Sequence, residues 1–362
     1  MKKISKSRAI SLYAHYVSRY KTRFFTRYGF DIVMDRREGI YFWDLDGKRF
    51  INLHCNGGVF NLGHRNPQTQ QALSDALEQF DIGNHHLISG MRGQLARKLC
   101  DSFRTGWFST PFSESIDTVV FAVSGGEAVD LAIKLARGYT RKTEIISISG
   151  GYHGHTGLAL GTGDEKYRDP FYISLPGFRQ IPFVEASELE RFVDDDTAAV
   201  ILETVPATLG MPIFPESVLR GIRRLTERRN IPLILDEIQT GLGRTGLAWG
   251  FQHYDILPDI VVTGKGLSGG LYPIAATCFR KKYERVFKND PFVHISTFGG
   301  SELACAVALK TLELSTNPEF LRSVRECSQL FVAELEQIKS RFPIIQEIRH
   351  LGLFMGIVFE DQ

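Results

Sequence analysis

Short apolar runs recur through the middle of the chain, and segments with helical spacing lie between many of them. The runs that we expect to form strands are residues 118–123, 144–149, 198–202, 231–235, 259–263 and 273–278. The segments with helical spacing are residues 126–140, 187–194 and 215–229. Strands that read as continuous apolar runs and alternate with helices are typical of a parallel sheet covered on both faces. The pattern therefore predicts an α/β fold.

The two ends of the chain follow a different pattern. Residues 30–53 read as antiparallel strands, with a turn signal at Asp46-Gly47. Long helical patterns over 301–314 and 317–340 are followed by two short strands, near 345–348 and 353–359. We therefore expect a second, smaller α+β domain to which both ends contribute.

The predicted division assigns residues 1–60 to the N-terminal segment of the small domain, 61–300 to the large domain and 301–362 to the C-terminal small domain. The sequence stops directly after the last predicted strand, so we expect this last part to be incomplete. The first thirty residues contain Lys and Arg but no acid. A basic arm can bind an anionic partner, but the helical spacing of Leu12, Tyr16 and Tyr20 favours a solvated helix with a tail.

Composition narrows the class of protein. The 362 residues are 43% hydrophobic and 23% charged, with a net charge of +2, which is ordinary for a globular protein and indicates neither nucleic-acid nor membrane binding. The five cysteines are scattered without a CxxC pair, which favours reduced thiols. No apolar run approaches the roughly 20 residues of a membrane span, and the start lacks a signal-peptide pattern. We expect a cytoplasmic location and no metal site.

Ligands of parallel sheets bind beyond the carboxyl ends of the strands, so the residues that follow each strand are the informative ones. Ser124, Gly125 and Gly126 follow the first strand and open a helix, whose free amides favour a phosphate. A tight turn with a serine cap is the alternative. Tyr152 and His153 follow the second strand among glycines. Either the aromatic ring stacks on a planar ligand, or it fills space at the edge of the sheet.

The next strands are followed by acids and a lysine. Glu203 follows residues 198–202, but by itself it is weak evidence for a binding site because such an acid is usually a cap or a surface group. Asp236 ends an apparently buried strand, and a buried carboxylate needs a partner. A helix cap is the alternative interpretation, but "GLGRTG" at 241–246 is a poor helix. Nothing nearby in the sequence supplies a cation for Asp236.

Lys265 lies between glycines after residues 259–263. Desolvation there would favour the neutral amine, which is a nucleophile toward aldehydes, whereas a solvated loop lysine is the alternative. Thr297 precedes two glycines and a helix, as a second candidate phosphate cradle. Together these elements require one ligand with a phosphate, a planar ring, a cationic ring nitrogen and an aldehyde. Pyridoxal 5'-phosphate has all four, and Asp236 would keep its ring nitrogen protonated.

The same residues resemble the class III aminotransferases, within the fold type I pyridoxal-phosphate enzymes. The stretches "SGGEAVD", "DEIQTGLGRTG" and "GKGLSGG" resemble the motifs of this family, and the resemblance extends from "YFWDLDGKRFINL" and "NLGHRNP" to "LGLFMGIVFE". It implies a large domain with a mostly parallel seven-stranded sheet flanked by helices, plus a small α+β domain from both chain ends.

The resemblance assigns a role to each residue around the cofactor ring. Lys265 resembles the lysine that forms the Schiff base, and Asp236 resembles the partner of the pyridine nitrogen. Gln239 resembles a contact near the phenolic oxygen. Tyr152 takes the place of the aromatic residue that stacks on the ring, and His153 beside it is assigned to the cofactor site as well.

Other roles concern the phosphate and the substrate. Gly125 and Gly126 resemble backbone donors to the phosphate. Thr297 resembles a phosphate contact that comes from the neighbouring subunit, which implies a homodimer with its active site at the interface. Glu203 matches an acid near the substrate in many members.

The implied activity is the transfer of an amino group from an amino acid or ω-amine to a 2-oxo acid, by a ping-pong mechanism in which Lys265 acts as general acid and base. An aminomutase of the glutamate-1-semialdehyde type or a dialkylglycine-type decarboxylase would use the same lysine, aspartate and phosphate cradle. A non-catalytic protein that binds pyridoxal phosphate is a further alternative, against which the Lys265–Asp236 pair argues.

The chain also departs from the family pattern. Gly126 replaces the usual Thr or Ala. His155 stands where acetylornithine-type enzymes carry an Arg that grips a substrate carboxylate, which disfavours acetylornithine or ornithine as substrate. Family members run on by several tens of residues and usually supply an Arg for the α-carboxylate. We therefore expect either a truncated fragment or a pocket that is completed in another way.

Overall fold

The computed structural model describes residues 4–104, 115–182 and 186–360, and a seven-stranded sheet forms its centre. The strands lie in the order β4-β10-β9-β8-β7-β5-β6. Their bounds are Ile116–Ala122 (β4), Glu144–Ile148 (β5), Phe178–Ile181 (β6), Thr197–Glu203 (β7), Leu233–Asp236 (β8), Ile260–Thr263 (β9) and Ala275–Arg280 (β10). Only β10 runs antiparallel to its neighbours. The predicted mostly parallel sheet of an α/β fold is confirmed.

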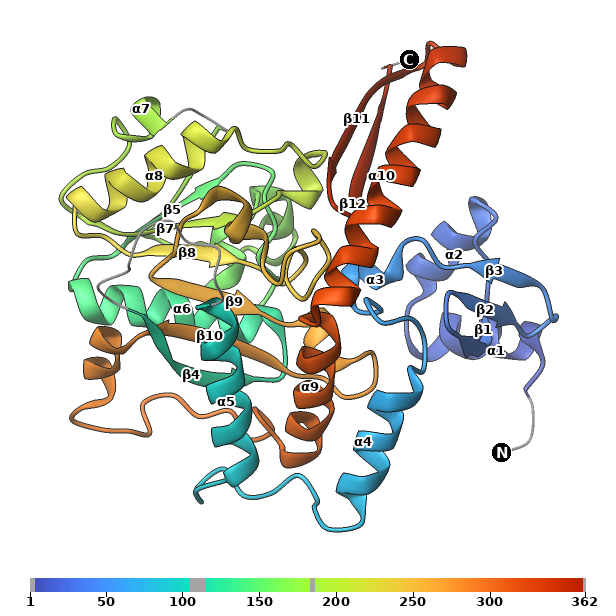
Figure 1. Cartoon of the computed structure of the whole chain (residues 1–362), viewed down its shortest axis with the longest axis horizontal. Helices are drawn as coiled ribbons and strands as arrows, with labels where there is room; N and C mark the ends of the chain where they lie inside the picture. Colours follow the sequence, from blue (N-terminus) through green and yellow to red (C-terminus); the bar gives the residue numbers. More distant parts are fainter. Residues whose placement is uncertain (1–3, 105–114, 183–185, 361–362) are drawn as a thin grey trace.

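Helices cover both faces of this sheet (Figure 1). Successive residues of a strand point to opposite faces, so Ile145 packs with α6 (Gly125–Thr140) while Ile146 packs on the other face. That second face is covered by α5 (Gly90–Phe103) and α8 (Glu216–Arg228). Because every residue of β7 to β10 is buried, these strands have no polar face, which explains their continuous apolar runs.

Two local predictions differ from the structure. The short edge strand β6, which was not predicted, lies beside β5. The predicted helix over 187–194 is too long, since α7 covers only Ala186–Leu189 and the segment ends in a turn around Asp194. In that turn Asp194 Oδ1 accepts from Asp196 N at 3.0 Å, and Thr197 Oγ1 accepts from Asp194 N at 2.9 Å. Such local bonds compete with the helix ladder.

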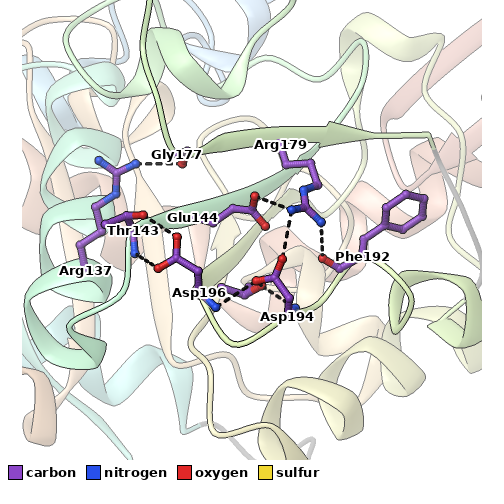
Figure 2. Close-up of polar contacts among 9 residues, drawn as sticks. Arg137, Thr143, Glu144, Gly177, Arg179, Phe192, Asp194 and Asp196 are labelled. Carbon is purple, nitrogen blue, oxygen red and sulfur yellow. Dashed lines mark hydrogen bonds and ion pairs between the residues drawn. The ribbon is translucent and has the colours of Figure 1, made fainter.

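A polar network fixes the edge of the sheet around β6 (Figure 2). Arg179 on β6 donates to the carbonyl of Phe192 and pairs with Asp194, both at 3.0 Å, and with Glu144 on β5 at 2.8 Å. Arg137 on α6 donates to the carbonyl of Gly177 at 2.9 Å. These side-chain bonds connect the edge strand β6 to β5, to α6 and to the segment around Asp194.

The N-terminal part forms a unit of its own beside the central sheet, shown in blue in Figure 1. Helices α1 (Lys6–Tyr16) and α2 (Arg19–Arg27) bury no side chain. They precede the antiparallel strands β1 (Met34–Glu38), β2 (Tyr41–Asp44) and β3 (Arg49–Ile51). The predicted antiparallel strands of this region are therefore confirmed. The short helix α3 (Cys55–Gly58) and α4 (Pro67–Leu77) lead on to α5.

The C-terminal part, red in Figure 1, consists of α9 (Glu302–Ser315), α10 (Pro318–Arg341) and the antiparallel pair β11 (Ile345–Leu351) and β12 (Phe354–Phe359). This pair forms a sheet separate from β1–β3. Short 3₁₀ helices complete the structure: η1 (Ala159–Thr162), η2 (Glu165–Tyr167), η3 (Asp169–Phe171), η4 (Ala207–Leu209), η5 (Gly250–Tyr254), η6 (Lys265–Ser268) and η7 (Lys281–Phe287).

The glycine-rich segment 241–246 connects the large sheet to the C-terminal part. Leu353 N donates to the carbonyl of Arg244 at 3.0 Å, and Arg325 of α10 donates to the carbonyl of Gly246 at 2.6 Å. The Arg244 side chain also contacts Asn61. The segment that follows Asp236 in the sequence therefore contacts both the region after β3 and the C-terminal hairpin.

Among the described residues, no helix combines the length and apolarity that crossing a membrane requires.

Candidate active site

A cavity of about 360 Å³ lies at the carboxyl ends of β4, β5, β7, β8 and β9. It is lined by Ser124, Gly125, Gly126, Tyr152, His153, Gly154, His155, Thr156, Glu203, Asp236, Ile238, Gln239 and Lys265. Every candidate residue of the sequence analysis except Thr297 is therefore among the lining residues. The topology explains this, because parallel strands end at the same edge of the sheet.

Asp236 ends β8 and is buried, and His153 is its partner. His153 Nδ1 lies 2.9 Å from Asp236 Oδ2, and Asp236 Oδ1 accepts from Ile238 N at 3.0 Å. Burial opposes the charge on His153, but its hydrogen bond to Asp236 and the negative charges nearby outweigh burial, so the pKa of His153 is raised. This partner lies 83 residues away along the chain, so no local sequence signal identifies it.

The adjacent carboxylate, Glu237, does not line the cavity and is satisfied by four donors. Its Oε1 accepts from Thr204 Oγ1 at 2.5 Å and Phe251 N at 2.9 Å, and its Oε2 accepts from Thr240 Oγ1 and Gly250 N, both at 2.8 Å. Burial raises the pKa of Glu237, while these bonds lower it. The two carboxylates that end the strand therefore differ in role: one faces the cavity and the other fixes the backbone behind it.

Lys265 follows β9 and is half-buried at the cavity. Burial lowers the pKa of its ammonium group, against the opposing charges of Asp236 and Glu203. Gly57 approaches it closely, since a Cβ on Gly57 would lie 3.3 Å from both Lys265 Cε and Gln239 Oε1. With its φ of +64°, Gly57 is a site residue that the sequence analysis missed, and its only sequence signal is the pair of glycines at 57–58.

The start of α6 presents its backbone to the cavity. Ser124 caps the helix, and its Oγ accepts from Glu127 N at 3.3 Å. A Cβ on Gly125 would lie 2.5 Å from Ile238 Cδ1, and one on Gly126 would lie 2.5 Å from Thr156 Oγ1. No side chain is therefore accommodated at either position without a shift of its neighbour, and the amides of a helix start suit a phosphate.

Tyr152 and Glu203 line the same cavity and contact each other. The backbone N–H of Tyr152 donates to Glu203 Oε1 at 2.9 Å. Burial raises the pKa of Glu203 to about 7, although the His153 charge opposes this shift. The Tyr152 ring lies edge-on to His155, with ring centroids 4.9 Å apart, and His155 in turn contacts Tyr167.

Thr297 is exposed and lies outside the cavity of its own chain. It is flanked by exposed apolar side chains, which include Val293, Ile295 and Phe298. In the described part of the chain, no group of three or more His, Cys, Asp or Glu side chains is arranged to hold a metal ion.

The lining residues fit pyridoxal phosphate. The cavity offers an amine with a lowered pKa, a buried carboxylate held by an imidazole, and a helix start at which glycines leave the backbone uncovered. These groups complement an aldehyde, a cationic ring nitrogen and a phosphate, respectively.

Comparisons with known proteins agree with this arrangement. Residues 26–362 match the family Aminotransferase class-III. The chain is 50% identical over 357 residues to an uncharacterized aminotransferase of Archaeoglobus fulgidus, which covers 99% of this chain and 82% of that protein. It is 34% identical over 349 residues to an acetylornithine aminotransferase of Methanopyrus kandleri, covering 95% and 85% of the two chains.

The fold is likewise similar to that of a solved structure. The crystal structure of the ornithine aminotransferase from Toxoplasma gondii ME49 superposes with a TM-score of 0.89, at 26% identity, covering 99% of this chain and 83% of the other. The chain belongs to the class III aminotransferases and is a pyridoxal-phosphate-dependent transaminase of fold type I.

Proposed function

We propose that Lys265 and Asp236 are the catalytic residues of a reaction that moves an amino group from an amino acid or ω-amine to a 2-oxo acid. The observation that carries this proposal is that both residues line one cavity together with the glycine start of α6. An aminomutase or a decarboxylase of the same family would share this lining, but relatives named as aminotransferases support transamination.

Bound pyridoxal phosphate supplies an aldehyde and an electron-withdrawing ring that stabilises a carbanion. Lys265 Nζ, with its lowered pKa, is the nucleophile for the aldehyde. When a substrate amine is bound, the same Nζ would be placed to take the proton from the substrate carbon as a base and to return it as an acid. Lys265 therefore acts in turn as nucleophile, base and acid.

The other lining residues hold the cofactor in place. Asp236 would accept the hydrogen bond of the ring nitrogen, and His153 would keep this carboxylate oriented and charged. Tyr152 would pack on the ring, and Gln239, which lies beside Lys265, would contact the phenolic oxygen. The amides of Gly125 and Gly126 would donate to the phosphate.

Glu203 faces the substrate. Since its pKa is raised to about 7, it changes between a neutral acid and a carboxylate near neutral pH. It can therefore accept from a donor amine when ionised, or donate a hydrogen bond to a substrate oxygen when protonated. His155 at the same cavity lacks the bidentate fork of an arginine. We therefore propose that this difference disfavours acetylornithine and ornithine as substrates.

A homodimer completes the proposed site, with Thr297 reaching the phosphate of the neighbouring subunit. The exposed position of Thr297, outside its own cavity, supports this arrangement. Leu87 and Ile88 are exposed, as are Phe292 and Phe298, and clustered exposed apolar side chains are typical of interfaces. The five free cysteines support a reducing, cytoplasmic location.

A panel of amine donors tests the proposed function. The protein is loaded with pyridoxal phosphate and incubated with each amine and a 2-oxo acid, and the oxo and amino products are measured together with CO₂. Transamination gives the oxo and amino products in equal amounts without CO₂. Release of CO₂ would indicate a decarboxylase. Isomerisation of the amine in the absence of a 2-oxo acid would indicate an aminomutase. Lys265→Ala should abolish turnover, and Lys288→Ala, which changes an exposed lysine, should not.

A further inference from the structure

Thr156 occupies the space in which a side chain at position 126 would lie. A Cβ on Gly126 would be 2.5 Å from Thr156 Oγ1 and 3.5 Å from its Cβ and Cγ2. Both residues line the cavity, at the start of α6. In this chain the hydroxyl at this point therefore comes from another segment, at position 156.

The segment that carries Thr156 is fixed to the first turns of α6. Thr156 Oγ1 donates to Asp130 Oδ2 at 3.2 Å, and Ala159 N donates to Asp130 Oδ1 at 2.6 Å. Gly154, with a φ of +120°, packs so closely that a Cβ on it would lie 2.7 Å from Gly126 Cα. The hydroxyl of Thr156 is therefore held beside the helix start by contacts on both sides of it.

We propose that Thr156 binds the phosphate of the cofactor, and that its hydroxyl takes over the hydrogen bond that a hydroxyl-bearing side chain at position 126 would make. This inference rests on the proposed function, which puts the phosphate at the amides of Gly125 and Gly126. It adds a residue that lies 30 positions further along the chain and on a different element.

The chemistry of the cavity lining supports this role. Apart from Lys265, the lining side chains that can carry a positive charge are His153 and His155, and His153 is engaged by Asp236. Apart from His155, phosphate binding from within this chain therefore depends on neutral donors. Ser124 Oγ accepts from Glu127 N as the helix cap and keeps its own proton. The Thr156 proton can turn from Asp130 to a phosphate oxygen because a hydroxyl rotates freely, so both hydroxyls can serve as donors.

Comparing two ligands tests the phosphate contact. Pyridoxal phosphate and pyridoxal, which lacks the phosphate, are each titrated into the cofactor-free protein and followed by absorption. Thr156→Val should weaken pyridoxal phosphate binding about tenfold and leave pyridoxal binding within about twofold. Thr156→Ser should bind both ligands like the original protein. Thr140→Val, which removes a hydroxyl at the other end of α6, is the control.

An exchange of the two side chains tests the spatial argument. Gly126→Thr alone should weaken pyridoxal phosphate binding because it collides with Thr156, and Gly126→Thr combined with Thr156→Gly should restore it. If Thr156→Val weakens both ligands equally, Thr156 only supports the loop and the inference is overturned. It is also overturned if Thr156→Val changes neither titration. If the original protein itself fails to bind pyridoxal phosphate, the proposed function fails instead.

Discussion

His153 and Asp236 form a buried pair, with Nδ1 of one side chain 2.9 Å from Oδ2 of the other. Both side chains lie beneath the cavity, at most 4% exposed. Asp236 thus has a hydrogen-bonding partner before any ligand arrives, and this bond offsets part of the cost of burying its carboxylate. The hydrogen bonds from His153 and from Ile238 N hold the Asp236 carboxylate in one orientation, and its remaining lone pairs are left for a ligand.

Replacing His153 with Phe should destabilise the cofactor-free protein in a pH-dependent way. The pKa of His153 is raised in the folded state, so the stabilisation from its protonated form is fully present below about pH 6.5 and is lost as the pH rises through the raised value. We expect His153→Phe to cost about 3 kcal/mol near pH 6 and less at high pH. Urea unfolding at several pH values measures this, with the exposed His350→Phe as control. An equal loss at every pH would contradict the pairing.

Glu203 should oppose folding as the pH rises. Its folded pKa of about 7 exceeds the ordinary 4.5, so the folded protein binds this proton more tightly than the unfolded chain does. Stability from Glu203 is present below about pH 4.5 and is lost up to about pH 7, by up to about 3 kcal/mol. Glu203→Gln should therefore gain stability relative to the original protein between pH 5 and pH 8. Unfolding free energies at both pH values test this, and the exposed Glu188→Gln should show no such trend.

Glu237→Ala should be among the most destabilising single changes near the site. It leaves buried donors of Thr204, Thr240, Gly250 and Phe251 without their acceptor, at a cost of about 3 kcal/mol or more. Denaturant unfolding measures the effect. The exposed Glu284→Ala is the control and should change stability by less than about 0.5 kcal/mol. A similar small effect for Glu237→Ala would show that the four hydrogen bonds contribute little.

Gly352→Ala should loosen the C-terminal hairpin from the segment 241–246. A Cβ on Gly352, whose φ is +61°, would collide with the backbone of Thr245. Gly47, with a φ of +82°, has no atom within 4 Å of such a Cβ and is therefore a control for backbone strain alone. We expect Gly47→Ala to cost about 1 kcal/mol and Gly352→Ala clearly more. Equal losses in thermal unfolding would mean that the contact with Thr245 is readily relieved.

Mixed dimers test the proposed position of Thr297. Lys265→Ala subunits are inactive, and Thr297→Val subunits are expected to bind the cofactor weakly. If Thr297 serves the neighbouring subunit, a mixed dimer has one site with both an intact lysine and an intact threonine. Mixing equal amounts of the two variants under subunit exchange should then restore activity toward about one quarter of the original value at low cofactor concentration, because half of the dimers are mixed and each has one intact site of two. No recovery after exchange would place Thr297 outside the partner's site.

The residues that follow the strands were identifiable from the sequence alone. Gly125, Tyr152, Glu203, Asp236 and Lys265 each stand just beyond an apolar run, and the structure brings all five to one cavity. The prediction was possible because parallel strands end at the same edge of a sheet. A residue that follows an apolar run within a few positions is therefore expected at that edge. The edge strand β6 was missed because its Phe178–Ile181 segment is short and has two polar residues in its middle.

Partners between distant segments required the tertiary structure. The pairing of His153 with Asp236, the approach of Thr156 to Gly126 and the contact of Gly57 with Lys265 depend on which strands are neighbours and how their loops fold back. The sequence around each residue was enough to predict that it follows a buried strand, because burial and turn preferences act over a few positions. The distances between residues on different loops are decided only when the sheet assembles in its β4-β10-β9-β8-β7-β5-β6 order and its two faces are packed.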